Sequence, residues 1–448
     1  MRVMSIAEDR KLPARVDVVV IGGGIIGICT ALALAGKGVS VAVCEKGVIG
    51  GEQSGRNWGW CRTARRDLRE LPLSLESLRL WRQMDRKLGI DTGFRQSGVL
   101  YTAGNAECLA EHERWLSRAK ALVGSTALSS RVVSAAATID LMPGIARRAA
   151  RAIVGGFHTP SDGQAAPEQA VPAMASALQA RGVRILTSCA VRGIETAAGA
   201  VSGVVTEHGS IRCASVVLAG GVWTRLFCAN IGIEIPQLAV RSSVLHTTPI
   251  AGGPEVSACH ETVGYRKRLD GSYTVASATR SLAELTPDSF RLLGRYWPIL
   301  KTQLGSMRFA LGRRFIEALC QPRAWPLDQP TVFERVRTLD PAPIRAHISA
   351  TLREFRALFP DLGSVEIVRA WAGDIDVTPD AVPVISRVDT LPGLVISTGY
   401  SGHGFGIGPG AGELTADILV NDAPIVDPRA FRLSRFSDGS RIELDGGF

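Results

Sequence analysis

The glycine motif Gly22-x-Gly24-x-x-Gly27 constrains this fold more than any other part of the chain. An apolar run precedes it and an Ala/Leu-rich segment follows it, which is the layout of a strand, a tight turn and a helix. Gly22 permits the sharp turn, Gly24 lets a pyrophosphate approach the backbone, and Gly27 lets the helix lie close to the sheet. A second apolar run ends at Glu45, where an acid can accept hydrogen bonds from adenosine ribose hydroxyls. The pattern predicts a dinucleotide site at a helix N-terminus, with a purely structural glycine turn as the alternative.

Length and composition indicate a globular protein with two or more lobes. The 448 residues exceed one typical core, and 46% hydrophobic with 21% charged residues argue against disorder. The net charge of +9 comes mostly from dispersed arginines, which favours a solvated surface over an anionic-substrate funnel or loose membrane-surface contact. No basic/aromatic motif predicts nucleic-acid binding.

The nine cysteines include no C-x-x-C pair and no zinc-like spacing, so we expect buried free thiols and no metal site. The polar N-terminal residues lack an apolar signal core, and no stretch reaches the length of a membrane span. We therefore expect a cytoplasmic protein, with peripheral membrane contact left open.

Hydrophobic periodicity places alternating helices and strands along the chain. Strands are expected at 94–102 (or a hairpin there), 183–186, 203–207 and 216–218, with a strand-rich region at 238–279. Helices are expected at 72–88, 106–122, 167–181, 282–307 and 343–359, and in a segment ending at 419.

Four landmarks in chain order resemble the flavin amine-oxidase group that includes D-amino-acid oxidase, glycine oxidase, sarcosine oxidase and the D-amino-acid dehydrogenases. They cover nearly the full length of the chain, and the fourth is the most specific. They are Gly22/Gly24/Gly27 with Glu45; Ser54-Gly55-Arg56; Ala219-Gly220-Gly221-Val222-Trp223; and Trp371-Ala372-Gly373 with Thr378-Pro379-Asp380, leading to Gly402-His403-Gly404-Phe405.

The resemblance implies that the dinucleotide is FAD, and it implies an α/β fold. A discontinuous Rossmann-like FAD-binding domain would carry a substrate domain built on a mixed or antiparallel sheet. The expected FAD-binding segments are 15–90, 150–235 and 365–425; the substrate domain takes 91–149 and 236–364, and 426–448 form a C-terminal extension.

Small and polar residues near the pyrophosphate and flavin, and glycine amides near the flavin edge, are the expected cofactor contacts. Val191 is included because relatives touch adenine through the backbone at this place, although it could equally be core. The predicted cofactor-binding residues are Gly22, Gly24, Ile25, Ile26, Gly27, Glu45, Lys46, Ser54, Gly55, Arg56, Asn57, Trp58, Val191, Ala219, Gly220, Trp223, Gly373, Gly402, His403, Gly404, Phe405 and Gly406.

The oxidation of an amine by flavin asks the protein mainly to hold the substrate carboxylate and to aim its C–H bond at the flavin. Arginine suits the first task because its guanidinium can bind a carboxylate in a bidentate manner. Arg62 is the first candidate, because sarcosine oxidases have a carboxylate-binding arginine near this point. Arg65 and Arg56 remain alternatives, as does a surface or flavin-contacting role for Arg62.

Six further side chains are weaker candidates for the substrate side. Tyr265 and Arg266 fall on strands that would roof the site, and His403 is expected to contact the flavin or its surroundings, with a catalytic base as the lesser role. Trp58 and Trp60 are expected to pack in the core more than to form an aromatic wall, and Trp371 is expected to be core.

The chain departs from its relatives at several positions. Glycine oxidase-like members have a carboxylate-binding arginine where Ile375 stands, and sarcosine oxidases have a flavin-linking cysteine at Gly373 and a lysine at Gly406. FAD is therefore predicted to be noncovalent at that position, and simple glycine, sarcosine or D-alanine substrates are not expected. The nearby acids Asp374 and Asp376 are expected to cap turns, with binding of a cationic amine as the alternative.

The sequence predicts an FAD-dependent enzyme that oxidises a C–N bond of an amino acid, an imino acid or a related amine. The electron acceptor is a quinone, another carrier or oxygen, with a slight preference for a dehydrogenase. An NAD(P)H-dependent flavin monooxygenase and a flavin-bound, non-catalytic subunit are the alternatives.

Overall fold

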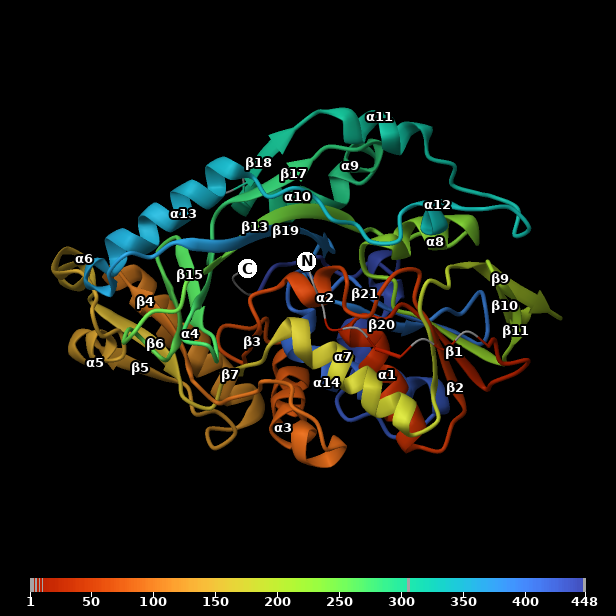
Figure 1. Cartoon of the computed structure of the whole chain (residues 1–448), viewed down its shortest axis with the longest axis horizontal. Helices are drawn as coiled ribbons and strands as arrows, with labels where there is room; N and C mark the ends of the chain where they lie inside the picture. Colours follow the sequence, from red (N-terminus) through yellow and green to blue (C-terminus); the bar gives the residue numbers. More distant parts are fainter. Residues whose placement is uncertain (1–3, 5, 8, 10, 304–306, 446–448) are drawn as a thin grey trace.

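Two large β-sheets organise the protein (Figure 1). The computed structural model describes residues 4, 6–7, 9, 11–303 and 307–445. Within these ranges one sheet has six strands and is here called the parallel sheet, and the other has ten and is called the mixed sheet. The architecture is α/β, as the sequence predicts.

The parallel sheet collects strands from three separate segments of the chain. Its strands run parallel except β20, which pairs antiparallel with β21 at one edge of the described sheet. The strands read as continuous apolar runs because both faces of the sheet are covered. Their order is β20 (Val384–Arg387), β21 (Leu394–Thr398), β12 (Ser215–Leu218), β1 (Val18–Ile21), β2 (Val41–Cys44) and β8 (Arg184–Leu186).

Helices cover one face of the parallel sheet, and a small sheet covers the other. The helices pack side by side around a core of Ile, Leu, Val and Ala side chains. They are α1 (Ile25–Gly36), α7 (Pro167–Ala180) and α14 (Gly404–Val420), with α3 (Leu71–Leu88) packed on α14. The opposite face carries β9 (Val191–Ala197), β10 (Ala200–Thr206), β11 (Gly209–Arg212) and α8 (Thr224–Asn230).

The mixed sheet lies beside the parallel sheet and is covered in part by α13 (Arg345–Leu358) (Figure 1). Most of its neighbouring strands are antiparallel, while β4 with β14 and β17 with β18 are parallel pairs. The order is β18 (Met307–Ala310), β17 (Ser281–Glu284), β13 (Leu238–Thr247), β16 (Tyr273–Ser277), β15 (Val263–Lys267), β14 (Ser257–His260), β4 (Val99–Ala103), β6 (Gly155–Thr159) and β5 (Arg131–Ser134).

One long strand joins the two sheets. β19 (Ile367–Val377) pairs antiparallel with β13 from Thr247↔Ile367 to Leu238↔Val377. The chain leaves the end of β19 at Thr378 and enters the parallel sheet at β20.

The helix expected at 282–307 is wrong in its first part. Residues 281–284 form β17, in which Leu282 pairs with Arg241 of β13. A new helix, α9 (Pro287–Arg291), begins after Thr286, whose side chain takes part in a capping box. Short apolar runs do not distinguish a strand from a helix, which explains the error. Helix α10 (Leu293–Gln303) follows, and residues 304–306 lie outside the described ranges.

The remaining elements are short or peripheral. They are α2 (Gln53–Arg56), β3 (Trp60–Cys61), α4 (Ala106–Val123), α5 (Ala135–Asp140), α6 (Arg147–Ala152), β7 (Gly163–Gln164), α11 (Arg313–Cys320) and α12 (Val332–Arg335).

No helix in the described part of the chain is both long enough and apolar enough to cross a bilayer.

Candidate active site

A cavity of about 410 Å³ lies between the two sheets. It begins at the carboxyl ends of β1, β2 and β12, where Ile21, Cys44 and Leu218 line it. It continues beneath β13 and β19, where Val240 and Ile375 line it. The crevice at the carboxyl ends of parallel strands is where α/β proteins bind their ligands.

Most of the predicted site residues line this cavity. They are Gly22, Gly24, Ile25, Ile26, Glu45, Lys46, Ser54, Arg56, Asn57, Trp58, Arg62, Val191, Ala219, Gly220, Trp223, Gly373, Gly402, His403, Gly404, Phe405 and Gly406. Gly27 and Gly55 do not line it, and neither do Tyr265 and Arg266.

The first glycine turn has no room for side chains. Gly22 adopts a φ of +110°, and a Cβ atom there would lie 2.4 Å from the Ala219 carbonyl oxygen. A Cβ atom on Gly27 would lie 1.9 Å from the Gly22 carbonyl oxygen, so Gly27 shapes the turn from behind the cavity. The amides of the first turn of α1 lack acceptors within the helix. The amide of Ile25 donates to Ser54 Oγ at 2.9 Å.

Glu45 closes the end of the cavity next to β2. Its carboxylate accepts hydrogen bonds from the amides of Gly23 and Gly47, both at 2.7 Å, while burial raises its pKa. The neighbouring Lys46 is engaged by protein groups, since its Nζ lies 2.6 Å from Glu52 Oε1 and over the ring of Trp223. Lys46 therefore fixes the loop around the cavity more than it offers a free cation.

A second helix N-terminus faces the other end of the cavity. Gly404, Phe405 and Gly406 form the first turn of α14 and line the cavity. Their amides have no acceptor within the helix, and the helix dipole is positive at this end. The cavity thus meets two positive helix ends, one from α1 and one from α14, which suits a long ligand with negative groups at separate points.

The later glycines of this region serve packing, which differs from the expected flavin contact. A Cβ atom on Gly408 would lie 2.5 Å from Ile25 Cγ1, and one on Gly412 would lie 2.5 Å from the Cys29 carbonyl carbon. Gly410 is similarly close to the Leu73 carbonyl oxygen of α3. These glycines let α14 approach α1 and α3 closely, and that approach brings the first turn of α14 to the cavity.

His403 is paired with a buried carboxyl group. Its Nδ1 lies 3.0 Å from Oε2 of Glu70, which is fully buried. Burial raises the pKa of Glu70 to about 8 and holds the pKa of His403 well below its usual range. Burial therefore favours the uncharged form of both groups at neutral pH.

Two arginines from the turn after β3 line the cavity. The Arg62 guanidinium lies 5.7 Å from the centre of the Tyr101 ring and donates to the Ala64 carbonyl oxygen. Arg66 is buried, and no described residue accepts a hydrogen bond from its Nη1. Burial lowers the pKa of Arg66 to about 9, with the neighbouring Arg62 charge adding to the shift.

The other two arginine candidates point elsewhere or are already bound. Arg65 does not line the cavity, and its Nη1 lies 3.2 Å from His112 Nδ1. Arg56 lines the cavity but donates to Asp340 and to the Ala372 carbonyl oxygen. Arg66, which the sequence reasoning missed, is therefore the buried cation with an open donor at the cavity.

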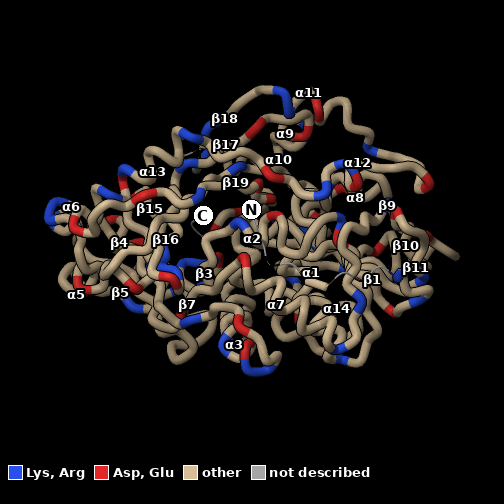
Figure 2. Tube along the Cα trace, in the orientation of Figure 1, with Lys and Arg blue, Asp and Glu red and all other residues tan. Residues whose placement is uncertain are grey.

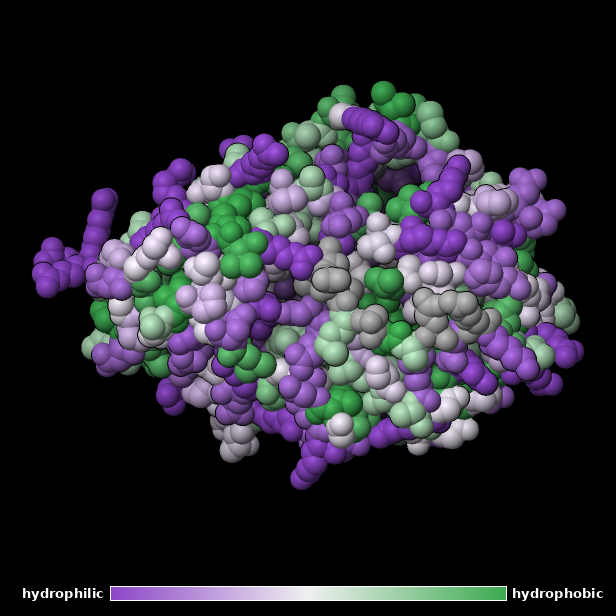
Figure 3. Space-filling model, in the orientation of Figure 1, coloured by the Kyte–Doolittle hydropathy of each residue, from purple (hydrophilic) through white to green (hydrophobic). Residues whose placement is uncertain are grey.

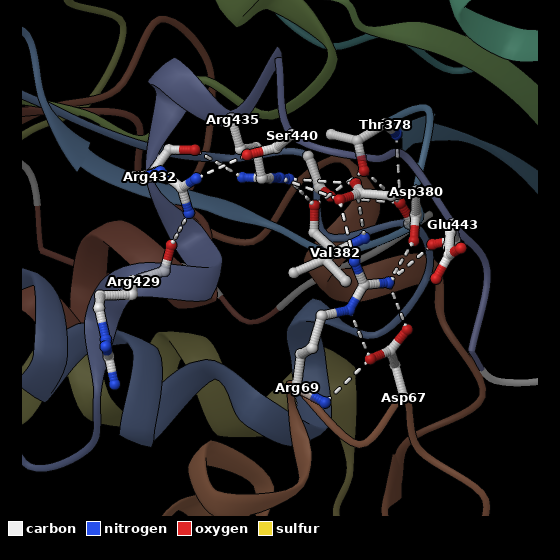
Figure 4. Close-up of polar contacts among 12 residues, drawn as sticks. Asp67, Arg69, Thr378, Asp380, Val382, Arg429, Arg432, Arg435, Ser440 and Glu443 are labelled. Carbon is white, nitrogen blue, oxygen red and sulfur yellow. Dashed lines mark hydrogen bonds and ion pairs between the residues drawn. The ribbon is translucent and has the colours of Figure 1, made fainter. Parts of the chain in front are cut away.

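Buried ion pairs hold the arginine turn in place (Figure 4). At its start, Asp162 accepts hydrogen bonds from the amides of Thr63 and Ala64. At its end, Arg69 binds Asp67 at 2.6 Å and reaches Asp380 at 3.4 Å. Asp380 belongs to the Thr-Pro-Asp landmark, whose geometry is thereby coupled to the turn.

The C-terminal segment completes this network (Figure 4). Arg435 is buried and binds both carboxylate oxygens of Asp380, at 2.9 and 3.1 Å, and the Val382 carbonyl oxygen at 2.6 Å. Arg69 also donates to the Glu443 carbonyl oxygen. Residues near the chain end therefore support the wall of the cavity from outside.

Tyr265 and Arg266 occupy the protein interior, which argues against the expected substrate contact. Tyr265 is buried against the rings of Tyr273 and Phe359. Arg266 is buried below Gly59, where a Cβ atom would lie 2.8 Å from its guanidinium carbon. The alternation of β15 turns both side chains into packed regions instead of toward the cavity.

Of the two acids of β19, Asp374 forms ion pairs instead of capping a turn, whereas Asp376 does accept a backbone amide of a neighbouring loop. Asp374 is buried and binds Arg241 at 2.9 Å and Arg314 of α11. Asp376 accepts hydrogen bonds from the Gln237 side chain at 2.9 Å and the Gly399 amide at 2.8 Å. Both acids connect β19 to neighbouring segments at the cavity.

Trp58 and Trp60 pack edge to face, with ring centres 5.3 Å apart, and also line the cavity. Trp371 is buried and does not line it, as expected for a core residue.

A known family model covers most of the chain. The model described as DAO, FAD dependent oxidoreductase, matches residues 17–418. Human sarcosine dehydrogenase is 27% identical over 97% of this chain and 43% of its own length. The chain spans less than half the length of the first curated relatives that it matches. The sarcosine oxidase subunit beta of Rhizobium meliloti is 25% identical over 96% of this chain and 90% of its own length.

Solved structures show the same fold. The L-amino acid deaminase from Proteus myxofaciens, solved in complex with anthranilate, has a TM-score of 0.93 and 34% identity, covering 98% of this chain and 97% of that one. The L-amino acid deaminase from Proteus vulgaris has a TM-score of 0.92 and 33% identity, covering 97% and 100%.

Proposed function

The chain belongs to the DAO family of FAD-dependent oxidoreductases, and from that premise we propose that it oxidises the C–N bond of an amino or imino acid. In this proposal the carboxylate of the substrate binds Arg66, with Arg62 beside it. The unpartnered Nη1 of Arg66 at the cavity is the observation that carries the proposal.

The cavity suits FAD in shape and in chemistry. The amides at the start of α1 would hold the pyrophosphate, and Glu45 stands where the adenosine ribose would lie. The amides at the start of α14 would face the flavin. Bound FAD supplies the hydride acceptor of the reaction. We propose a noncovalent cofactor, because glycine stands at position 373, where sarcosine oxidases have the linking cysteine.

A buried guanidinium with an open donor favours an anionic ligand. Leaving a buried charged donor unpaired costs free energy, and a carboxylate that accepts its hydrogen bonds removes that cost. Arg266 and Arg268 also have an unpartnered nitrogen, yet neither lines the cavity. Arg66 thus has both the open donor and the access.

The walls around the arginines support a substrate with an apolar side chain. Trp58, Trp60 and Tyr101 line this part of the cavity, with Val240 and Ile375 on the mixed-sheet side. Such walls would exclude water from the reacting C–N bond and would bind an apolar or aromatic group. The names of the L-amino acid deaminases agree with an amino acid as the substrate.

The surroundings of Gly406 support a dehydrogenase that passes electrons to a quinone or another carrier. A Cβ atom on Gly406 would lie 2.7 Å from the Trp60 carbonyl oxygen. No lysine therefore fits at this position, where sarcosine oxidases have one. The experiment below distinguishes this electron acceptor from oxygen.

The test is anaerobic reduction of the bound flavin, which is monitored through its visible absorbance. The panel contains D- and L-amino acids with apolar side chains, N-methyl amino acids, cyclic imino acids and simple amines. We expect bleaching by an apolar amino acid, and admission of air then separates an oxidase from a dehydrogenase. FAD that no amine reduces would overturn the proposal and favour NADPH-driven chemistry or a non-catalytic flavoprotein.

Arg66→Met tests whether Arg66 binds the substrate carboxylate, with Arg65→Met as the matched control. Loss of hydrogen bonds between charged groups lowers the apparent second-order rate of reduction by roughly 10- to 100-fold in the first variant. The control should stay close to the wild type because Arg65 does not line the cavity. Equal rates in the two variants would reject Arg66 as the carboxylate site.

A further inference from the structure

We propose that residues 325–340, here called the strap, close the adenosine end of the cavity and retain FAD there. The strap contains α12 and precedes α13, and the structure describes all of its residues. Figure 1 shows α12 beside α8, and ring contacts between the two helices agree with this placement. The inference concerns retention of the cofactor and goes beyond the proposed oxidation.

An aromatic cluster places the middle of the strap at the cavity. Phe333 is buried and lines the cavity. The centre of its ring lies 5.9 Å from that of Trp223 and 6.0 Å from that of Phe227, and both of these residues also line the cavity. Trp325, at the start of the strap, packs on Phe333 with ring centres 5.5 Å apart. The strap therefore contributes part of the cavity wall.

The loop after β2 binds the backbone of the strap. Lys46 Nζ donates to the carbonyl oxygens of Val336 and Arg337, at 2.8 and 3.1 Å. Glu52 binds the same ammonium group and accepts a hydrogen bond from the Leu339 amide at 2.9 Å. Lys46 and Glu52 both line the cavity. Two side chains at the cavity thus hold the strap closed over it.

Gly47 lets the strap lie directly on this loop. A Cβ atom there would lie 2.1 Å from the Arg337 carbonyl oxygen and 2.8 Å from Thr338 Oγ1. The φ angle of Gly47 lies outside the left-handed region, and the residue does not line the cavity. The close approach of the strap, and not the local backbone conformation, therefore requires glycine at this position.

Ion pairs bind the strap to three further parts of the protein, and Figure 2 shows basic and acidic segments close together around α12. The pairs are Glu334 with Arg192 of β9, Arg337 with Glu207 beside β10, and Asp340 with Arg56 of α2. Arg335 of α12 is exposed and forms no ion pair within the described part of the chain. Figure 3 shows a largely hydrophilic surface at the place of α12, so the strap turns its polar side to solvent.

A cofactor behind the strap leaves only while the strap is open. The strap belongs to neither large sheet, so its opening breaks the contacts described above and leaves both sheets intact. The dissociation rate of FAD is then the open fraction multiplied by the rate from the open state. Changes that weaken the closed strap should therefore speed release, even where the changed residue does not line the cavity.

The experiment measures release of FAD from the loaded, full-length protein after dilution, through the fluorescence of free FAD. Gly47→Ala places a Cβ atom against the strap backbone and should raise the dissociation rate roughly tenfold or more. Arg337→Met removes the partly exposed pair with Glu207 and should raise the rate roughly three- to tenfold. Wild-type rates in both variants would overturn the proposal.

Two matched controls separate the strap contacts from the substitutions themselves. Arg335→Met removes an exposed arginine of the same strap, and Gly104→Ala adds a Cβ atom whose nearest neighbour lies 4.0 Å away. Both variants should release FAD at the wild-type rate. Equal acceleration by Arg335→Met and Arg337→Met would contradict the proposal, because only Arg337 binds the protein beneath the strap.

Phe355→Leu separates release through the strap from a general loss of stability. Phe355 is fully buried in the core beside the mixed sheet and does not line the cavity. The variant should lower the melting temperature and leave the dissociation rate of FAD unchanged. Release that follows the melting temperature alone, whichever residue is changed, would overturn the proposal. The measurements use no substrate, so failure of the proposed oxidation would leave their outcome unaffected.

Discussion

Replacing Glu70 with glutamine is predicted to remove a contribution to stability that declines between pH 6 and pH 8. Glu70 is fully buried, and burial raises its pKa from an ordinary 4.5 to about 8. The charges around it are Arg66, Arg62 and Arg69, which oppose the rise, and Asp67, which adds to it. The glutamine has nearly the same shape and keeps a donor for the ring nitrogen of its partner.

The sign of the effect follows from proton binding. Between the ordinary pKa and about 8, the carboxyl group is ionised in the unfolded chain and protonated in the folded one. The folded state therefore binds the extra proton, and the contribution of Glu70 to stability falls as pH rises through this window. From pH 6 to pH 8 the loss is about 2 kcal/mol. For a chain of this length that corresponds to roughly 2 °C in melting temperature.

The assay is the thermal melt of the FAD-loaded protein at pH 6, 7 and 8, for the wild type and Glu70→Gln. Glu76→Gln is the matched control, because Glu76 lies on α3, the helix that Glu70 precedes, and its side chain is partly exposed in a pair with Arg79. The control should keep the pH dependence of the wild type. Burial also raises the pKa of Asp162, to about 6, so the difference between variants is read above pH 6.5. The same slope in Glu70→Gln as in the wild type would refute the reasoning.

Three further changes test the packing around the cavity. Gly412→Ala places a Cβ atom within 2.5 Å of the Cys29 backbone and should lower the free energy of unfolding by about 1–3 kcal/mol. Gly36→Ala, where no atom lies within 4 Å of the new Cβ, should raise it by up to about 1 kcal/mol in the same melts. Equal melting temperatures would contradict the close packing of α14 on α1. Gly27→Ala should yield protein with little FAD, seen as a low ratio of visible to ultraviolet absorbance, and normal FAD content would show that the turn adapts. Asp374→Asn removes the carboxylate shared by Arg241 and Arg314 and should speed trypsin cleavage in and around α11. An unchanged cleavage rate would show that other contacts hold α11 in place.

The dinucleotide end of the site could be predicted because local rules determine it. Gly22 and Gly27 fit a turn that admits no other residue, and this requirement appears directly in the sequence. Continuous apolar runs also predict β1, β2, β8 and β12 of the parallel sheet, whereas no strand was expected at β20 or β21. Glu45 follows from its place at the end of the second strand.

The substrate end depends on geometry that sequence spacing does not contain. Arg65 adopts a φ of +53°, and the chain turns there so that Arg66 lines the cavity while Arg65 meets His112. Neighbouring arginines in a loop give no indication of this choice. Tyr265 and Arg266 were expected at the site because they lie on a strand near it, but the direction of each side chain depends on the packing of the whole mixed sheet.

The glycine-rich segment before and within α14 combines two roles that composition cannot separate. Its first members line the cavity, while Gly408 and Gly412 bring the helix against α1. A glycine that binds a ligand and a glycine that admits a neighbouring helix look the same in the sequence.

The pairing of β13 with β19 limits how members of this family can be recombined. A chimera cut at the end of the mixed-sheet segment near residue 364 would combine β13 from one parent with β19 from another, across a ladder that runs from Thr247↔Ile367 to Leu238↔Val377. It would also separate Asp376 from Gln237, which binds it. A transplanted substrate module should therefore include both strands and be joined after Val377. To exchange substrate preference between relatives, β13 and β19 should therefore be transferred together, with the residues that bind them.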